Sequence, residues 1–449
     1  MYMAKRDGFA SSFGVLVAMA GSAVGLGNLW RFPYLVGTNG GAAFIILYLV
    51  CILLLALPIM YSEFIIGRRS QANVFGAFEV LAPKTGWCNM GFIFVLCSIV
   101  IISFYCVVGG WTLDYFFKSL AFKFTSADSA ALDGMFGATV TSAGSSLGYM
   151  MLFLLATALI LYAGVKNGIE KYTKVMMPML FVMVIVIAIR SVTLPGASAG
   201  LDFLLKPDFS KVTAKTFLEA LGQAFFSLSV GSGSIMTYAS YVKKRESIVG
   251  LSAQTAITDT VFAIIAGLAI MPAVFAFGIS PGQGPGLVFV TLPYIFAQLP
   301  LGSILAIMFF FMLFIAALTS SISMLEVVVA YLSEEFKLGR TLSIVISTTA
   351  VTALGTLCAL SQGVLADFKI FGNNIFDCFD KLSANILLPL GGLIVVIFVG
   401  WKMSKKDVLH ELTSGGTHKY PAALQNIIYL SMKYLAPIVV AVILVRGLF

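Results

Sequence analysis

The chain has 449 residues, of which 59% are hydrophobic and 11% are charged, and its mean hydropathy is +1.00. Soluble domains carry about 25% charged residues, so this composition excludes a soluble globular protein and predicts an all-α polytopic membrane protein. The formal net charge is +8, but the basic residues gather in short loops between apolar segments, so no nucleic-acid partner is expected.

Apolar segments long enough to cross a bilayer predict about eleven transmembrane helices. In chain order they cover approximately residues 12–37, 41–66, 89–120, 147–164, 169–191, 215–240, 250–278, 300–332, 341–359, 374–401 and 427–446. Lys and Arg cluster in alternate loops, and the loop near 279–299 has neither. By the positive-inside rule the N-terminus is expected in the cytoplasm, in a multi-pass protein of the cell (inner) membrane with the lipid bilayer as partner.

The first span is interrupted in its middle by glycines, an asparagine and an arginine, within residues 20–33. Inside hydrocarbon every backbone N–H and C=O must be paired, so a broken helix is tolerated only where it faces protein or a wet cavity. A glycine-rich face for helix packing is the alternative, but such a face needs neither Asn28 nor Arg31. An arginine at this depth costs roughly 2.5 to 3.5 kcal/mol on insertion scales. The segment therefore predicts a broken helix that binds a ligand.

The sixth span contains a second interruption, the glycine-rich and hydroxyl-rich segment 223–234. If spans one to five and six to ten form two halves, both interruptions fall in the first helix of a half. Discontinuous helices at corresponding positions indicate a midplane site in a transporter built as a 5+5 inverted repeat. We expect a first repeat over 1–191, a second over 192–401, and a cytoplasmic loop plus an eleventh helix over 402–449.

Two broken helices at one depth suit an amino acid and a sodium ion. Their N-terminal N–H groups attract a carboxylate, while carbonyl oxygens and hydroxyls replace the hydration shell of a small cation. Ser22, Ser227, Ser229 and Ser232 add further hydroxyls at the two breaks.

Polar residues in the later spans have both structural and functional interpretations. The hydroxyl run at 316–321 in span eight is, taken alone, typical of helix packing. Asp259 in span seven is expected to face inward, because exposing it to lipid is costly. Asp377 and Asp380 open span ten, where they can pair with Arg31.

Neither an enzyme nor a metal centre of Cys and His ligands is predicted. No nucleophile–base pair is evident, and the two histidines, His410 and His418, lie in a polar loop. Six cysteines occur without a CxxC pair, so packing is their expected role.

Five motifs are spread along nearly the whole chain. They are Gly-Leu-Gly-Asn-Leu-Trp-Arg-Phe-Pro-Tyr at 25–34, Asn-Gly-Gly at 39–41, Gly-Gly-Trp-Thr-Leu at 109–113, Thr-Tyr-Ala-Ser-Tyr at 237–241 and Leu-Thr-Ser-Ser at 318–321. With these motifs the chain resembles the neurotransmitter:sodium symporter family, particularly its bacterial amino-acid transporters. The first motif is highly specific.

The resemblance implies a substrate pocket in which Tyr105 bonds the ligand carboxylate and Phe226 forms a lid. The implied lining is Ser22, Ala23, Leu26, Gly27, Ile101, Tyr105, Phe226, Ser227, Ser229, Ser232, Ser320 and Met324. At the position of Ser232 a bacterial leucine transporter of the family has an aromatic residue. The smaller side chain leaves room, and Met324 is a pliable wall, which favours a large hydrophobic or aromatic amino acid.

The resemblance also implies two sodium sites. The first would use Ala23, Asn28, Ser227 and a span-seven ligand that is either Thr258 or Asp259. The second would use the carbonyls of Gly21, Val24 and Ala316 with the hydroxyls of Thr319 and Ser320. Five oxygens without a carboxylate suit a monovalent ion better than Ca²⁺.

Asp259 lies where animal members of the family hold a chloride, near Tyr48, Gln223 and Ser227, which match other positions of that anion site. A fixed carboxylate can supply the same negative charge, so no chloride requirement is expected.

Two gates can be mapped from the family. On the outer side Arg31 would meet Asp380, and on the inner side Arg6 would meet Glu334, with Tyr241 packed nearby.

The expected function is a sodium-coupled symporter that imports hydrophobic or aromatic L-amino acids by alternating access. One alternative is a proton-coupled transporter of the same fold, which sodium-independent uptake would indicate. Another is a non-transporting amino-acid sensor, which would bind its ligand without moving it across a membrane.

Overall fold

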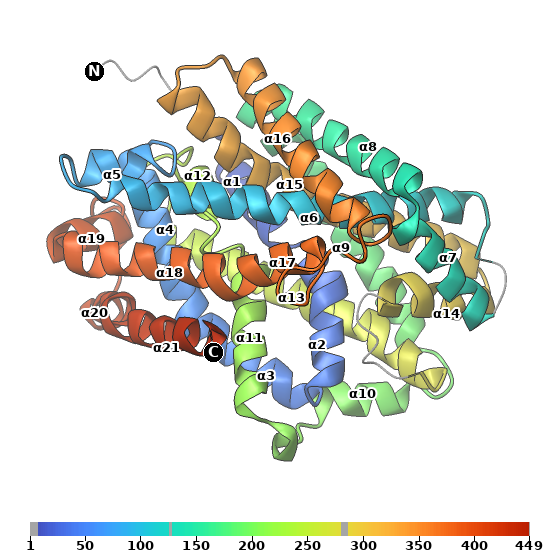
Figure 1. Cartoon of the computed structure of the whole chain (residues 1–449). Coiled ribbons are helices and arrows are strands. Elements are labelled where there is room, and N and C mark those ends of the chain that lie inside the picture. Colours follow the sequence, from blue (N-terminus) through green and yellow to red (C-terminus); the bar gives the residue numbers. More distant parts are fainter. Residues whose placement is uncertain (1–7, 125–127, 280–285, 449) are drawn as a thin grey trace.

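A computed structural model describes residues 8–124, 128–279 and 286–448 of the chain. Within these ranges the protein is all-α and contains no strand, apart from one isolated bridge between Ile370 and Asn373. The all-α membrane architecture predicted from composition is therefore confirmed (Figure 1).

The helices follow one another along the chain with short breaks. The α-helices are α1 (Ser12–Ala23), α2 (Phe32–Thr38), α3 (Ala42–Cys51), α4 (Leu57–Ser70), α5 (Gly76–Leu81), α6 (Cys88–Leu120), α7 (Ser129–Thr141), α8 (Ala143–Tyr162), α9 (Lys171–Val192), α10 (Ser198–Leu205), α11 (Ala214–Ser227), α12 (Ser234–Ala239), α13 (Ile248–Ala276), α14 (Leu292–Gln298), α15 (Gly302–Glu335), α16 (Arg340–Leu360), α17 (Ile375–Leu382), α18 (Leu388–Ile397), α19 (Lys405–Leu412), α20 (Ala422–Leu430) and α21 (Ala436–Leu448). Short π or 3-10 segments extend several of them: η1 (Gly27–Arg31), η2 (Ile52–Ala56), η3 (Val165–Glu170), η4 (Phe209–Lys211), η5 (Leu287–Thr291), η6 (Ser383–Leu387), η7 (Phe398–Lys402) and η8 (Ser431–Leu435).

The membrane spans agree with the apolar segments of the sequence. Among the described residues nine helical runs are long and apolar enough to cross a membrane, and α1 with η1 and α2 makes a tenth that bends by 48°. The remaining predicted span, 215–240, consists of α11 and α12 on either side of a break at 228–233. The connections between the predicted spans also contain short helices, among them α7, α10 and α14.

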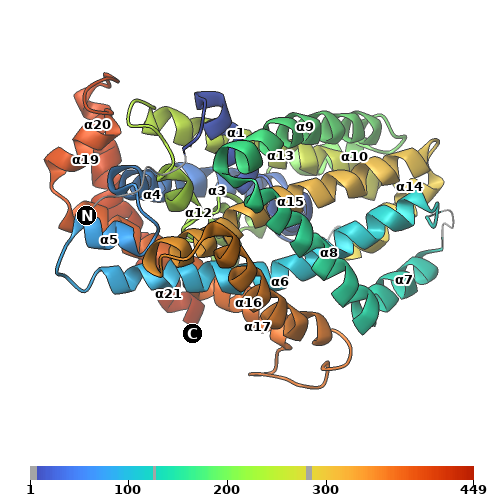
Figure 2. The same ribbon diagram turned by 90° about the horizontal axis from the view of Figure 1, so that it is seen from above.

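Both broken helices lie inside the bundle, as the need to pair their free backbone groups requires. The helix α1 packs against α9, α13 and α15, and α12 packs against α4 and α15. Around them, α6 lies against α8, α15 and α16, and α18 lies beside α21 (Figures 1 and 2).

Side chains satisfy the backbone at both breaks. At the first, Asn28 Oδ1 accepts a hydrogen bond of 3.0 Å from the Gly25 N–H. At the second, the buried carboxylate of Glu63 accepts from the N–H groups of Gly231, at 2.6 Å, and Met236, at 3.2 Å. These bonds replace the helical ones that the breaks remove, so the irregular backbone can persist at this depth.

The second break also depends on a glycine that no other residue can replace without strain. Gly231 has φ +83, and a Cβ at this position would lie 2.1 Å from the carbonyl oxygen of Leu388. The glycine therefore lets the unwound segment pass directly against α18.

Candidate functional site

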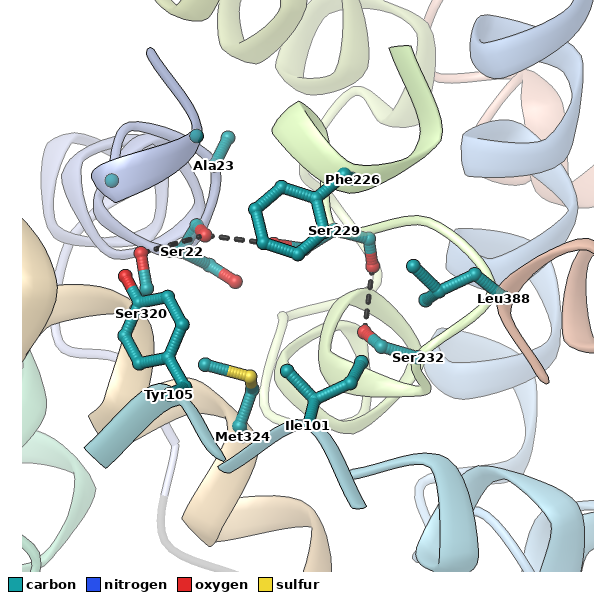
Figure 3. Close-up of a pocket in the computed structure, with 12 residues that line it drawn as sticks. Ser22, Ala23, Ile101, Tyr105, Phe226, Ser229, Ser232, Ser320, Met324 and Leu388 are labelled. Carbon is teal, nitrogen blue, oxygen red and sulfur yellow. Dashed lines mark hydrogen bonds between the residues drawn. The ribbon is translucent and has the colours of Figure 1, made fainter. Parts of the chain in front are cut away.

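A cavity lies between the two helix breaks, with α6, α15 and α18 closing its other sides (Figure 3). Its lining consists of Ser22, Ala23, Gly25, Gly27, Ile101, Tyr105, Phe226, Ser229, Ser232, Ser320, Met324 and Leu388. The space between these atoms amounts to about 390 Å³, of which about 30 Å³ can hold the centre of a water molecule. The cavity is therefore contracted, and a bulky ligand requires its walls to move.

One edge of the cavity is polar. The carbonyl of Ser22 accepts hydrogen bonds from Ser229 Oγ at 2.8 Å and Ser320 Oγ at 3.3 Å (Figure 3). The Tyr105 hydroxyl accepts from the Leu26 N–H at 3.4 Å. Hydroxyls and backbone groups of the first break are thus gathered where a ligand carboxylate and amine can be held.

The other edge is apolar and includes the predicted lid. A Cβ added to Gly27 would lie 3.0 Å from the Phe226 ring, so the ring covers the first break closely. Ile101, Met324 and Leu388 face the same space (Figure 3). This edge suits a hydrophobic side chain.

Ten of the twelve residues expected from the sequence line the cavity, and two do not. Leu26 contributes its backbone N–H to Tyr105 instead, and the Ser227 hydroxyl points away to Asp259. Gly25 and Leu388 line the cavity without having been predicted. Gly25 lies within a motif that the sequence singles out, whereas Leu388 is one apolar residue among many in its span.

Beside the cavity lies a buried cluster around Asp259. Its carboxylate accepts from Asn28 Nδ2 at 2.7 Å, from Ser227 Oγ at 2.7 Å and from the Tyr48 hydroxyl at 3.1 Å. Asp259 is fully buried, whereas Thr258 is only half-buried, so Asp259 is the span-seven residue that faces the first break.

The Asp259 carboxylate forms no ion pair with any residue inside the described ranges. Neutral donors alone compensate a buried charge poorly, because removing an ion from water costs several kcal/mol. The cluster is therefore suited to a bound cation. The amide oxygen that would coordinate it, Asn28 Oδ1, here accepts from Gly25.

The residues of the second expected cation site also converge. Thr319 Oγ1 lies 3.0 Å from the Ala316 carbonyl and 3.5 Å from the Val24 carbonyl. Ser320 Oγ lies 3.5 Å from the Ala316 carbonyl, and a Cβ on Gly21 would lie 3.5 Å from Thr319 Cβ. Carbonyl and hydroxyl oxygens of this kind favour a hard monovalent cation.

Arg31, which the sequence assigns to the outer gate, lies beside the lid. Arg31 forms no ion pair with Asp380 in this conformation. Its guanidinium carbon instead lies 5.0 Å from the centre of the Phe226 ring, and its Nη1 is buried without a hydrogen-bond partner. A guanidinium stacked on a ring keeps its N–H groups available for a carboxylate, so this contact is compatible with a pair of Arg31 and Asp380, which stays a prediction.

The inner side is closely packed. Arg6 lies outside the described residues. Glu334 accepts hydrogen bonds from the Asn73 backbone N–H at 2.8 Å and from its side chain at 3.0 Å. Phe9 packs edge-on against Tyr238 and Tyr241, with ring centres 5.9 and 6.3 Å apart.

Sequence reasoning missed Glu63, Glu326 and Arg340. Tyr241 donates a hydrogen bond of 2.7 Å to the buried carboxylate of Glu326. Arg340 forms an ion pair of 2.8 Å with the same carboxylate. Glu63 clamps the second break. Glu63 and Glu326 are acids inside apolar spans, and that pattern alone could have singled them out.

Comparison with known proteins agrees with this geometry. The model of the sodium:neurotransmitter symporter family matches residues 6–131 and 129–449. A sodium-dependent transporter of Bacillus subtilis, YhdH, is 38% identical over 97% of this chain and 96% of its own length. A sodium-dependent transporter of Haemophilus influenzae is 37% identical over 99% of this chain and 99% of its own length. The bovine sodium-dependent dopamine transporter is 26% identical over 88% of this chain and 63% of its own length.

Among solved structures, that of MhsT in complex with L-phenylalanine matches with a TM-score of 0.92 at 43% identity, over 99% of this chain and 100% of that one. The family match spans both broken helices and the residues of the cavity. The chain belongs to the sodium:neurotransmitter symporter family and is a sodium-dependent transporter rather than an enzyme.

Proposed function

We propose that the protein imports hydrophobic or aromatic L-amino acids together with sodium, by alternating access. The observation that carries this proposal is a small cavity at two helix breaks with the buried carboxylate of Asp259 beside it, which pairs with no Lys, Arg or His among the described residues. Substrate and ion then share the broken backbone of α1, so each favours the arrangement that binds the other.

The proposed substrate follows from the two edges of the cavity. Tyr105 and the first break hold the carboxylate, while Phe226, Ile101 and Met324 surround the side chain. The similar solved structure, that of MhsT, is a complex with L-phenylalanine, which supports a substrate of this class. Met324 can change rotamer at low cost, so the contracted cavity can widen around a large ligand.

The proposed ions are two sodium ions, one at the Asp259 cluster and one between Thr319, Ser320 and the Val24 carbonyl. Asp259 supplies the negative charge that would otherwise require chloride. The N-terminus is placed in the cytoplasm on the positive-inside rule, with the two repeats bounded at 191 and 401 as the sequence predicts.

Uptake into liposomes tests this function. Reconstituted protein with an inward sodium gradient should accumulate L-phenylalanine, L-tryptophan or L-leucine, and replacing sodium by potassium should abolish the uptake. Uptake that persists without sodium but follows a pH gradient would instead support the proton-coupled alternative. Binding of these amino acids without any uptake would support the sensor.

Enlarging Ser232 tests the size of the pocket. The Ser232 side chain lines the cavity and donates a hydrogen bond of 2.7 Å to the Ser229 carbonyl. Ser232→Phe should weaken binding of tryptophan and tyrosine more than that of leucine, since overpacking typically costs about 1–3 kcal/mol. Scintillation proximity binding of the three amino acids provides the measurement.

The variant Ser232→Ala is the matched control, because it removes the same hydroxyl without adding volume. It should leave the ranking of the three amino acids unchanged. Equal losses for all three in Ser232→Phe would show that the position does not set the size limit.

A further inference from the structure

A second cavity lies at the end of the molecule that carries α5 and α19, far from the helix breaks in the fold (Figure 1). Its volume is about 490 Å³, which lies in the range of small-molecule sites. Its charged and titratable lining consists of Arg69, Lys244, Lys402, Asp407, His410 and Glu411. These residues come from four different parts of the chain, so the cavity exists only in the folded protein.

The two acids of the cavity are already neutralised by arginines. Asp407 lies 2.7 Å from Arg69, and Glu411 lies 2.9 Å from the buried Arg68 and 3.9 Å from Arg69. A hydrogen bond from Ser404 and the nearby Arg69 hold the pKa of Asp407 below its usual value. Asp407 therefore remains ionised and keeps Arg69 occupied at neutral pH.

Two cations of the lining remain uncompensated. Lys244 and Lys402 are exposed, and neither forms an ion pair within the part of the chain that the structure describes. When the adjacent Arg68 is counted, four cations face the two acids, which leaves two excess positive charges around the cavity, and such a cavity attracts an anion.

The aromatic and basic residues beside Lys402 indicate that the cavity opens near the lipid headgroups. Trp401, which precedes Lys402, is 64% exposed and donates a hydrogen bond of 2.9 Å to the Lys433 carbonyl. The Lys433 ammonium lies 5.9 Å from the Trp401 ring and 5.6 Å from the Tyr434 ring. Exposed Trp and Tyr with snorkelling lysines mark the membrane interface.

We propose that this cavity binds a phosphate group between Lys244 and Lys402, as carried by an anionic phospholipid of the leaflet on that side. A phosphodiester headgroup fits a site that offers two ammonium groups beside an apolar bilayer. A free phosphate ion shares the same chemistry and is distinguished by the experiment. The site is separate from the substrate cavity and does not depend on which amino acid is transported.

The position of Lys244 connects such a ligand to the inner gate. Its neighbour Lys243 donates to the Ala10 carbonyl at 3.4 Å, and Glu246 accepts from Ser12 at 2.8 Å. A phosphate bound by both Lys244 and Lys402 therefore connects the loop between α12 and α13, which contacts the start of α1, to the end of η7. A phosphate bound in this cavity therefore stabilises the packed arrangement of the inner gate.

Thermal unfolding of the purified full chain in detergent tests the site. Dihexanoyl phosphatidylglycerol should raise the melting temperature saturably, whereas dihexanoyl phosphatidylcholine, which is zwitterionic, should not. In the double variant Lys244→Gln, Lys402→Gln the half-saturating concentration should rise by roughly 25-fold, since each lysine near an anionic surface contributes about a factor of five. Retained stabilisation by sodium would show that the variant is folded.

Lys405→Gln with Lys406→Gln is the matched control, because both lysines lie on α19 but outside the cavity. This pair should keep the response of the unmodified protein. Inorganic phosphate is titrated in parallel, and a response to it that the Lys244, Lys402 variant loses would identify free phosphate as the ligand of the same site. Equal losses in the two lysine pairs, an equal response to phosphatidylcholine, or no stabilisation by any phosphate compound would overturn the proposal.

Discussion

Replacing Asp259 by serine is expected to abolish uptake in chloride-free medium and to make uptake depend on added chloride. The carboxylate is fully buried and accepts hydrogen bonds from Asn28, Ser227 and Tyr48. At about 4 Å and an effective dielectric constant of about 20, one unit charge attracts a cation by about 4 kcal/mol. Its loss should therefore reduce sodium-driven uptake by about three orders of magnitude. Uptake by proteoliposomes in gluconate and in chloride media is the measurement.

The variant Asp259→Asn distinguishes the loss of the negative charge from the room that a smaller side chain leaves for an anion. It removes the charge but leaves no room for an anion, so chloride should not restore its activity. Serine leaves that room beside Tyr48 and Ser227. A chloride requirement in the unmodified protein would contradict this role of Asp259.

Changing Thr319 and Ser320 together to alanine is expected to raise the sodium concentration for half-maximal uptake by at least about 100-fold. Each hydrogen bond or ligand contact to a charged group contributes about 1.5–3 kcal/mol, and the double variant removes two of them. Their hydroxyls lie against the Val24 and Ala316 carbonyls, so the remaining oxygens alone hold the ion weakly. Uptake of a labelled amino acid against sodium concentration provides the measurement.

Ser321→Ala is the control for this pair. Ser321 lies on the same helix, but its hydroxyl points to Thr157 of α8 at 2.8 Å. This variant should keep the sodium dependence of the unmodified protein. An unchanged half-saturation in the Thr319, Ser320 variant would rule out the second sodium site.

The positions of the broken helices could be predicted from sequence because polar and charged residues in hydrocarbon are costly and clustered glycines weaken a helix. Asn28 and Arg31 in the first span favoured a break over a glycine-rich packing face, and the glycine-rich and hydroxyl-rich segment 223–234 indicated a second break. The partners that hold those breaks open were not predictable. Glu63 reaches the second break from α4, and no local pattern indicates which distant backbone an intramembrane acid will contact.

The candidate site likewise has one part that could be predicted from sequence and one part that could not. Most of its lining lies in the first, third, sixth and eighth spans, and the resemblance to the family identified ten of the twelve lining residues. Leu388 and the contact of Arg31 with Phe226 were not identified, because they depend on how α18 and the lid pack in one conformation. The register in span seven was open between Thr258 and Asp259 until burial favoured Asp259.

The sequence by itself determined that this protein lies in a membrane and that its first and sixth spans are broken, and it predicts oxygen ligands rather than metal-binding His or Cys at the breaks. These features follow from the local cost of placing each residue type in hydrocarbon. Only the tertiary structure decided that Asp259 faces Asn28, that Arg31 lies over the lid, and that Lys244 and Lys402 share a cavity. Such pairings join residues far apart in the chain, and the packing of whole helices, not local preference, sets them.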